Sequence, residues 1–214
     1  MYGKVFKPIL DVLLAIVFVV LFWWLYIVLA IMVRTKLGSP VLFKQERPGQ
    51  IDPKTGEERI FKLYKFRTMT DARDSEGNLL KDSERLTKFG SFLRKTSLDE
   101  IPEILFNVLI HRNMSWVGPR PLLVSYIPWY TERERHRHDV KPGITGLAQV
   151  SGRNFLGWDK RIETDVQYVE NISLAMDIKI VWLTVYKIFV RADIAVDTNA
   201  VESNLAVERK AKMN

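Results

Sequence analysis

Residues 12–33 contain no charged side chain, and this run of 22 residues limits what the chain can fold into more than any other feature. As a helix it would be about 33 Å long, which is close to the hydrocarbon thickness of a bilayer. The run is longer than the apolar part of a signal peptide, and it ends in Arg34-Thr35-Lys36 rather than in the small residues of a cleavage site. The sequence therefore predicts a membrane helix within residues 1–38.

The charges that flank this run leave its orientation open. Lys4 and Lys7 precede it, and Arg34 and Lys36 follow it, so the positive-inside rule favours neither direction. Equally basic flanks suit a re-entrant helix that enters and leaves on the same side of the membrane. Asp11 lies just inside the apolar boundary, where a carboxylate needs a partner. We expect a re-entrant helix, and a helix that spans the bilayer is the alternative.

The rest of the sequence has the composition of a charged, compact domain. A formal net charge of +7 favours anionic partners such as phosphates, anionic lipids or nucleic acid. The absence of cysteine excludes disulfides, thiolate zinc sites and cysteine nucleophiles. A chain of 214 residues can form one domain beside the membrane element. We expect this domain over residues 39–196 and a polar tail over residues 197–214.

Local patterns predict an α/β (α+β) fold that is mostly helical with a small sheet. Residues 41–44 and 60–66 have strand composition, and turn residues at 52–56 would join them as a hairpin. Leu147–Val150 should add a short apolar strand. Helices are expected at 86–94, 99–109, 123–136, 158–170 and 174–191. In the last of these helices, an apolar stripe at helical spacing favours burial in the core.

The first motif that carries chemistry is Ser97-Leu98-Asp99-Glu100-Ile101-Pro102. Proline is tolerated in a first helical turn, so Pro102 indicates a helix that starts near Asp99. Two carboxylates then lie at the positive end of the helix dipole, which stabilises anions and attracts phosphate. An ionised Asp99 could attack phosphorus, and Glu100 could hold a divalent metal ion. The alternative is a purely structural capping box from Ser97 to Glu100.

Three further segments offer cations or a phosphate-binding backbone. Lys65 and Arg67 lie at the end of the second strand, where they could clamp phosphate or keep an edge strand soluble. In Gly118-Pro119-Arg120-Pro121, two prolines fix the backbone around one guanidinium, and a rigid connector is the alternative. The glycine-rich segment 141–154 contains Arg153 and is typical of a phosphate cradle, or of turns around a buried strand. It is not a Walker A loop.

In this order, the motifs resemble those of the bacterial sugar transferases, the monotopic phosphoglycosyl transferases that initiate glycoconjugate assembly. The matching segments are Lys65-Phe66-Arg67-Thr68-Met69, Ser97–Pro102, Phe106-Asn107-Val108-Leu109, Met114–Pro121 and Lys141–Asn154. The resemblance runs from Tyr2 to Arg191, and the length is similar to that of the small members, which consist of the catalytic core. It implies an enzyme of the bacterial cytoplasmic membrane with its catalytic domain on the cytoplasmic face.

The resemblance also implies a reaction and its residues. A sugar-1-phosphate would pass from a UDP-sugar to polyprenyl (undecaprenyl) phosphate, with release of UMP, through a phosphosugar–aspartate intermediate. Asp99 matches the nucleophile, and Glu100 matches its partner, which helps to hold Mg²⁺. The basic positions implied around the phosphates and the nucleotide are Lys65, Arg67, Arg94, Arg120 and Arg153. Asp165 matches an acidic position associated with the active site.

Two positions depart from the family pattern. Many members have Gly-Asp where this chain has Arg112-Asn113, which removes a carboxylate. Many also break the N-terminal helix with Ser-Pro, where this chain has Trp23-Trp24 and no proline. Two other classes stay open, namely an inactive homologue and a membrane-anchored module that binds anionic lipid or nucleic acid. No motif indicates a nucleic-acid partner, so we expect none.

Overall fold

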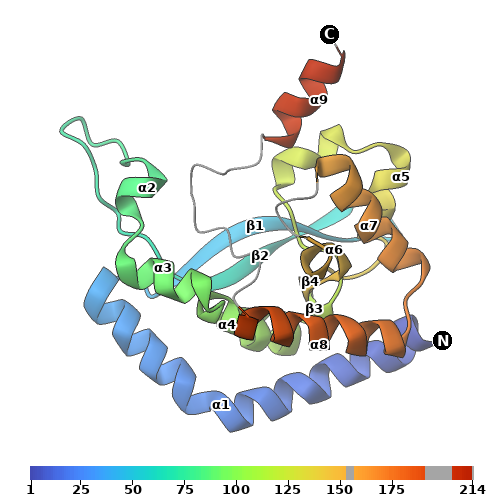
Figure 1. Ribbon diagram of the computed structural model, residues 1–214, viewed down its shortest axis with the longest axis horizontal. Coiled ribbons are helices and arrows are strands. Elements are labelled where there is room, and N and C mark those ends of the chain that lie inside the picture. Colours follow the sequence, from blue (N-terminus) through green and yellow to red (C-terminus); the bar gives the residue numbers. More distant parts are fainter. Residues whose placement is uncertain (153–156, 191–203, 214) are drawn as a thin grey trace.

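The computed structural model describes residues 1–152, 157–190 and 204–213 of the chain. The strands are β1 (Leu42–Ile51), β2 (Glu58–Phe66), β3 (Ser115–Val117) and β4 (Gly143–Thr145). The helical segments are η1 (Tyr2–Phe6), α1 (Lys7–Leu37), α2 (Asp82–Arg85), α3 (Lys88–Lys95), η2 (Leu98–Glu100), α4 (Ile101–Glu103), η3 (Ile104–Ile110), η4 (Val124–Trp129), α5 (Glu132–Arg135), η5 (His136–His138), α6 (Leu147–Val150), α7 (Trp158–Glu170), α8 (Leu174–Val190) and α9 (Leu205–Met213). In Figure 1, α1 lies along one side of the molecule with α8 next to it, and α9 lies at the opposite end.

β1 and β2 form the predicted hairpin as an antiparallel ribbon. Its register runs from Leu42 opposite Phe66 to Pro48 opposite Ile60, and shifts between Pro48 and Ile51. β3 and β4 form a second, parallel two-stranded sheet. The other elements are helical, so the prediction of an α+β fold that is mostly helical with small sheets is confirmed.

The predicted strand at Leu147–Val150 is wrong, because these residues form the helical turn α6 and the preceding Gly143–Thr145 is the strand. Four consecutive apolar residues do not distinguish a strand from a buried helical turn. Glycine is needed in β4, since a Cβ atom on Gly143 would lie 2.1 Å from the backbone nitrogen of Gly118. The glycines thus let β4 approach the loop that follows β3.

α1 is bent at Phe22, whose φ of −116° and ψ of 17° are not helical (Figure 1). The bend lies beside Trp23-Trp24 and forms without proline. Ala15 in the first arm and Leu29 in the second arm are both buried in clusters that include side chains of β2. The two arms therefore pack on the same body, and the re-entrant topology stays a prediction.

A buried polar cluster, here named the anchor cluster, fastens the first arm of α1 to β3, α7 and α8. Its members are Tyr2, Lys7, Asp11, Ser115, Tyr168 and Asp177. The Asp177 carboxylate lies 2.7 Å from Lys7 Nζ and accepts hydrogen bonds at 2.7 Å from the hydroxyls of Tyr2 and Tyr168. Asp11 accepts a hydrogen bond of 2.7 Å from the Ser115 hydroxyl. The carboxylate that needed a partner in the sequence therefore has one.

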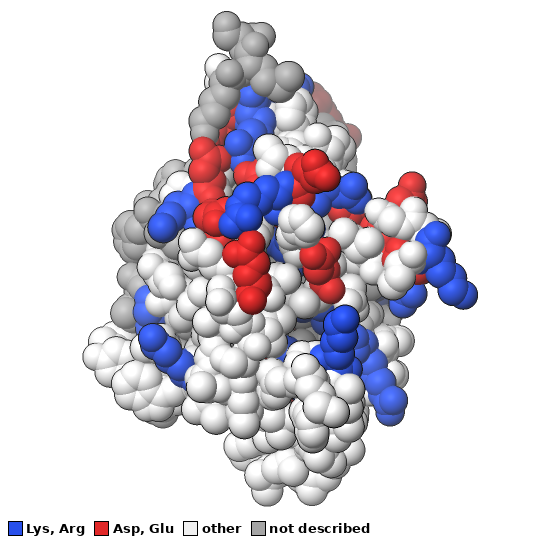
Figure 2. All heavy atoms as spheres, turned by 90° about the vertical axis from the view of Figure 1, so that its right-hand side faces the viewer, with Lys and Arg blue, Asp and Glu red and all other residues white. Residues whose placement is uncertain are grey.

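Apolar side chains of α1 and α8 are exposed and form what we name the apolar surface. Among the described residues, only the helical segment Tyr2–Leu37 is long and apolar enough to cross a membrane, and 11% of its most apolar window is buried. In α8, Val181, Trp182 and Val185 are 41%, 63% and 47% exposed. The prediction that this stripe lies in the core is therefore wrong, because helical spacing reveals an apolar face but not what covers it. Figure 2 shows an uncharged lower part of the molecule, bordered by Lys and Arg side chains.

The stretch expected to be a polar tail contains a packed helix in its described part, α9. Leu205 is fully buried in a cluster with Tyr126 and Trp158. Arg209 forms an ion pair with Glu134. Arg209 also lies 2.9 Å from Asp159. A single buried leucine and the ion pairs of one arginine are signals too weak to detect in a polar sequence, but they hold α9 on the domain.

Candidate active site

Asp99 lies near the start of a helical segment that continues from η2 through α4 into η3. Ser97 precedes it with φ 55° and ψ 19°, a left-handed conformation that is strained for a residue other than glycine. The Ser97 side chain makes no capping hydrogen bond, so the capping-box alternative is wrong. A capping box occurs instead at Thr131 and Glu134. The motif thus starts a helix, as predicted, without using its carboxylates as caps.

Glu100 binds two cations through one oxygen. Its Oε1 atom lies 2.6 Å from Lys65 Nζ and 2.8 Å from an Arg120 Nη atom. Lys65 comes from β2 and Arg120 from the loop after β3, so the site joins three distant segments. Glu103 Oε1 lies 3.3 Å from the same Lys65 nitrogen but makes no hydrogen bond. These four residues and Asp99 are named the site cluster below.

The carboxyl groups of the site cluster have separated pKa values. Burial first, and the charge of Glu100 second, raise the pKa of Asp99 to about 6. Burial also raises the pKa of Glu100, but Lys65 and Arg120 together outweigh it and hold that pKa well below its ordinary value. Burial raises the pKa of Glu103 to about 7, because Glu100 adds to it and Lys65 offsets it only in part. Glu100 is therefore the carboxylate that stays ionised.

Asp99 and Glu100 can therefore do different chemistry. Glu100 is neutralised by two cations, whereas no described residue gives the Asp99 carboxylate a hydrogen bond or an ion pair. Asp99 is 8% exposed, so it is mostly buried but still in contact with solvent. An ionised carboxylate with free lone pairs beside fixed cations can attack an electrophile such as phosphorus.

The remaining predicted cations lie in different places. Arg94 donates a 3.0 Å hydrogen bond to the Thr68 hydroxyl. Its charge offsets part of the rise in the pKa of Asp99, so it lies close enough to belong to the site. Arg67 is buried and donates to the backbone carbonyl of Pro40 and, at 3.0 Å, to Asp71. Its role at the phosphates stays a prediction. Arg153 lies outside the described residues, so its role also stays a prediction.

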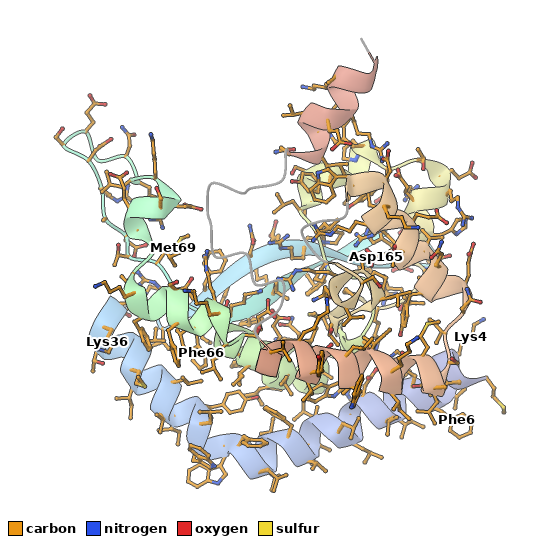
Figure 3. All side chains as sticks on the ribbon, viewed as in Figure 1. Lys4, Phe6, Lys36, Phe66, Met69 and Asp165 are labelled. Atoms are coloured by element: carbon orange, nitrogen blue, oxygen red, sulfur yellow. The ribbon has the colours of Figure 1, made fainter. Side chains whose placement is uncertain are left out.

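Asp165 reaches the site only through another residue. It is 2% exposed on α7 and lies 2.6 Å from a guanidinium nitrogen of Arg137. Arg137 in turn donates a 2.7 Å hydrogen bond to the backbone carbonyl of Arg120. Figure 3 places Asp165 toward one end of the β1–β2 ribbon, and Phe66 and Met69 toward the other. Through Arg137, Asp165 is connected to the Arg120 loop, and its predicted role at the substrate stays a prediction.

Sequence reasoning missed Glu103 and Arg47. Arg47 in β1 donates to the backbone carbonyl of Pro121 at 3.3 Å and to the Gln45 side chain at 2.6 Å, and its Nε atom is buried without a partner. It forms no ion pair within the described part of the chain, and burial together with the charge of Arg120 lowers its pKa to about 10. Arg47 and Arg120 are neighbouring cations, and Arg47 has no carboxylate partner among the described residues. This arrangement favours an anionic ligand. No local pattern singles out Arg47, because its loop partner lies 74 residues away.

The site cluster fits a metal ion only together with a substrate. No group of three or more acidic, histidine or cysteine side chains that could hold a metal occurs among residues 1–152, 157–190 and 204–213. Mg²⁺, however, is usually held by one or two carboxylates and by substrate phosphates. Asp99 and Glu100 provide such carboxylates. They therefore fit a Mg²⁺ ion that arrives with a diphosphate, and they do not form a complete cage.

The departure at Arg112-Asn113 has a structural explanation. The side-chain oxygen of Asn113 accepts a 3.0 Å hydrogen bond from Asn107, which is bonded in turn to the backbone of Lys62 and Tyr64 in β2. An amide therefore performs the packing role of this position. Arg112 has a φ of 53°, a left-handed conformation that glycine adopts at lower cost.

Comparison with known proteins gives consistent matches. A family model described as bacterial sugar transferase matches residues 2–191. An uncharacterized sugar transferase of Bacillus subtilis, EpsL, is 57% identical over 158 residues, which cover 74% of each chain. Two UDP-glucose:undecaprenyl-phosphate glucose-1-phosphate transferases, from Klebsiella pneumoniae and Escherichia coli, are 40% and 37% identical over 88% of this chain. The aligned part is 41% of the length of each of these two relatives.

Proposed function

The chain belongs to the bacterial sugar transferase family, and we propose that it transfers a sugar-1-phosphate from a UDP-sugar to polyprenyl phosphate and releases UMP. The observation that carries the proposal is the Asp99 carboxylate, which is sheltered, has no protein partner among the described residues, and lies beside paired cations. Relatives named for UDP-glucose and undecaprenyl phosphate support these substrate classes.

In the first step, an Asp99 oxygen attacks the phosphorus that bears the sugar. The bond from this phosphorus to the oxygen of UMP breaks, and UMP leaves with the electron pair. A phosphosugar–aspartate forms. Lys65 and Arg120 neutralise the charge that develops on the phosphoryl oxygens, and Glu100 holds both cations in place.

In the second step, a phosphate oxygen of the polyprenyl phosphate attacks the phosphorus of the intermediate. The bond to Asp99 breaks, the carboxylate is regenerated, and the product is a polyprenyl diphosphate sugar. No proton is gained or lost over the two steps. A soluble nucleotide and a lipid can thus use the same carboxylate in turn, which predicts ping-pong kinetics.

We also propose a Mg²⁺ ion that is held by the Glu100 carboxylate, with Asp99 beside it, and by the diphosphate of the substrate. When bound, it would supply charge neutralisation at the phosphoryl oxygens. Activity should be lost in EDTA and return with Mg²⁺. Full activity in the chelator would exclude this role.

Arg47 extends the proposed substrate site. It lies next to Arg120 without a carboxylate partner in the described part of the chain, and both guanidinium groups are connected to the Gly118-Pro119-Arg120-Pro121 loop. A diphosphate would compensate both charges with hydrogen bonds that guanidinium groups form well. We assign Arg47 to the UMP half of the donor on this basis.

We place the protein on the cytoplasmic face of the bacterial cytoplasmic membrane, with the bend of α1 in the lipid and both arms returning to one side. The chain has no cysteine, so Lys4→Cys and Glu76→Cys can each be labelled alone with a membrane-impermeant thiol reagent on spheroplasts. Both should be protected until the membrane is permeabilised. Labelling of Lys4→Cys alone would show a spanning helix, and labelling of both would place the domain outside.

The function itself is tested by measuring UMP release from a panel of UDP-sugars by the purified protein in lipid nanodiscs, with and without polyprenyl phosphate. We expect one UDP-sugar to give UMP and a lipid-linked product. Absence of UMP with every sugar would contradict the proposal. Asn113→Asp is a useful companion, since a lesion at this position would be repaired by the carboxylate, whereas the observed packing predicts no gain.

A further inference from the structure

A cavity of about 340 Å³ lies next to the Ser97–Pro102 motif and is lined mainly by apolar side chains. Three segments that are distant in the sequence form its walls. Phe18 contributes from the first arm of α1, Val181 and Val185 from α8, and Ile101 and Ile104 from the helix that follows Asp99. The cavity volume falls in the range of small-molecule sites, which is roughly 300–1,000 Å³. It is therefore large enough for a ligand of substantial apolar area.

Several polar residues also line the cavity. Its lining includes Ser97 and Glu100, so it reaches the motif that contains Asp99. Gln149 also lines it, and the Gln149 Oε1 atom is buried without a hydrogen-bond partner. A neighbouring pair of hydroxyls, from Thr145 and Thr184, lies 2.6 Å apart. The cavity thus combines mainly apolar walls with a few polar groups, of which Ser97 and Glu100 belong to the motif that contains Asp99.

The same cavity is continuous with the apolar surface. Val181, Val185 and Ile188 line it and are also 41%, 47% and 40% exposed on α8. Phe18 lies close to the bend of α1, and its ring packs against Phe22 with centroids 4.7 Å apart. An apolar chain could therefore pass from the membrane to the catalytic motif without crossing water, which lowers the free energy of reaching the site.

We propose that this cavity binds the first isoprene units of the polyprenyl phosphate acceptor and aims its phosphate at Asp99. The inference rests on the proposed function and assigns α8 as one wall of the acceptor site. A nucleotide or a sugar fits the cavity poorly, because hydroxyl groups would lose water against apolar walls and find few partners. An isoprenoid has no hydroxyl groups that would lose water, and its phosphate would lie next to the Ser97–Pro102 motif, which borders the cavity.

The test is a bulky substitution in the cavity with a matched control on the same helix. Val185→Trp should fill the space and raise the KM for polyprenyl phosphate by about tenfold or more. Release of the first UMP, measured without acceptor, should stay unchanged. Ile178→Trp, which is 60% exposed and does not line the cavity, should behave like the unsubstituted protein in both assays. An unchanged KM in Val185→Trp, or the same rise in Ile178→Trp, would overturn the assignment.

A second measurement uses the unsubstituted protein and so does not depend on the folding of a variant. A farnesyl phosphate that carries a photoreactive group at its apolar end should crosslink to α8 or to the bend of α1, and excess polyprenyl phosphate should prevent this. Crosslinking elsewhere would overturn the proposal. If no UDP-sugar gives UMP, the proposed function fails by itself, while the crosslinking still reports whether the cavity binds an isoprenoid phosphate.

Discussion

The site cluster and the anchor cluster are both buried, and both join segments that are distant in the chain, but they differ in how completely their charges are satisfied. In the anchor cluster, Asp177 has a cation and two hydroxyl donors, each at 2.7 Å. In the site cluster, Asp99 has no partner among the described residues, and Glu103 keeps one buried oxygen without a hydrogen bond. The first arrangement stabilises a structure. The second keeps buried carboxyl oxygens without hydrogen-bond partners, which is the arrangement that the proposed substrate would use.

The two clusters predict different effects when the charge of a buried carboxylate is removed. Removal of the charge from a satisfied group leaves a buried cation without its partner, which is destabilising. Removal of the charge from an unsatisfied group takes away a desolvation penalty and leaves the fold intact. The same substitution, Asp to Asn, should therefore have opposite effects on activity and stability in the two clusters.

The largest expected effect is on the activity of Asp99→Asn. The amide cannot act as the nucleophile, so UMP release should fall by about 10³-fold or more. The free energy of unfolding at pH 7.5 should not fall, because the substitution removes a buried charge whose pKa is raised by burial. Activity and thermal unfolding in the same nanodiscs check both parts. Near-normal turnover would remove Asp99 from the mechanism.

Asp177→Asn should show the reverse pattern. It leaves Lys7 buried without its closest carboxylate, so we expect a loss of about 3 kcal/mol in the free energy of unfolding. The released first arm of α1 should also become sensitive to proteolysis. Any residual folded protein should release UMP at a normal rate per folded molecule. A variant that is fully stable and inactive would contradict a purely structural role of the anchor cluster.

Arg47→Met should raise the KM for the UDP-sugar by about tenfold, because one charge-assisted contact to the diphosphate is lost. The KM for the lipid acceptor should stay the same. The side-chain length is similar, so packing in β1 is retained. Equal rises in both KM values, or a fall in thermal stability alone, would indicate that Arg47 is only a structural support for the Pro121 loop.

The pH dependence should report the raised pKa of Asp99. In the free enzyme, kcat/KM for UMP release should increase about tenfold between pH 5 and pH 7 as the nucleophile ionises near pH 6. The free energy of unfolding should change in the opposite direction. Because the pKa of Asp99 is higher in the folded than in the unfolded protein, its protonated form stabilises the fold below the unfolded pKa. This contribution is lost as the pH rises through about 6. Glu103→Gln should keep this rise, because burial and Glu100 set the pKa of Asp99. A flat profile would contradict the assignment.

The smallest expected effect is at the family departure. Arg112→Gly relieves a φ of 53° and should change the free energy of unfolding by no more than about 1 kcal/mol, toward higher stability. UMP release should be unchanged. A large change in activity would connect this turn to the site in a way that the contacts of Asn113 and Asn107 do not indicate.

Local patterns predicted the elements of this fold, and distant contacts decided their arrangement. The apolar run, the hairpin and the helix at Asp99 follow from spacing, turn residues and Pro102. The partner of Asp11 did not, because Ser115, which donates a hydrogen bond to it, lies 104 residues away, and no proline marks the bend of α1 at Phe22. The burial of the apolar stripe in α8 was mispredicted for a related reason, since spacing does not distinguish a protein core from a membrane.

The same division holds for the candidate site. The motif order indicated Asp99, Glu100, Lys65 and Arg120, and the structure brings these residues together. Arg47 and Glu103 carry no motif signal, because their importance comes from burial next to charges of other segments. Asp165 contacts Arg137, which donates to the backbone carbonyl of Arg120, a connection that no sequence spacing could reveal, and its predicted role at the substrate stays a prediction.

The proposed phosphosugar intermediate on Asp99 can be observed by mass spectrometry of the protein quenched after mixing with UDP-sugar in the absence of lipid acceptor. We expect a mass gain of one phosphosugar on the peptide that contains Asp99, one equivalent of UMP, and neither in Asp99→Asn. Addition of polyprenyl phosphate should discharge the adduct. Release of UMP only when the acceptor is present, with no adduct on any peptide, would exclude the covalent intermediate and indicate direct transfer.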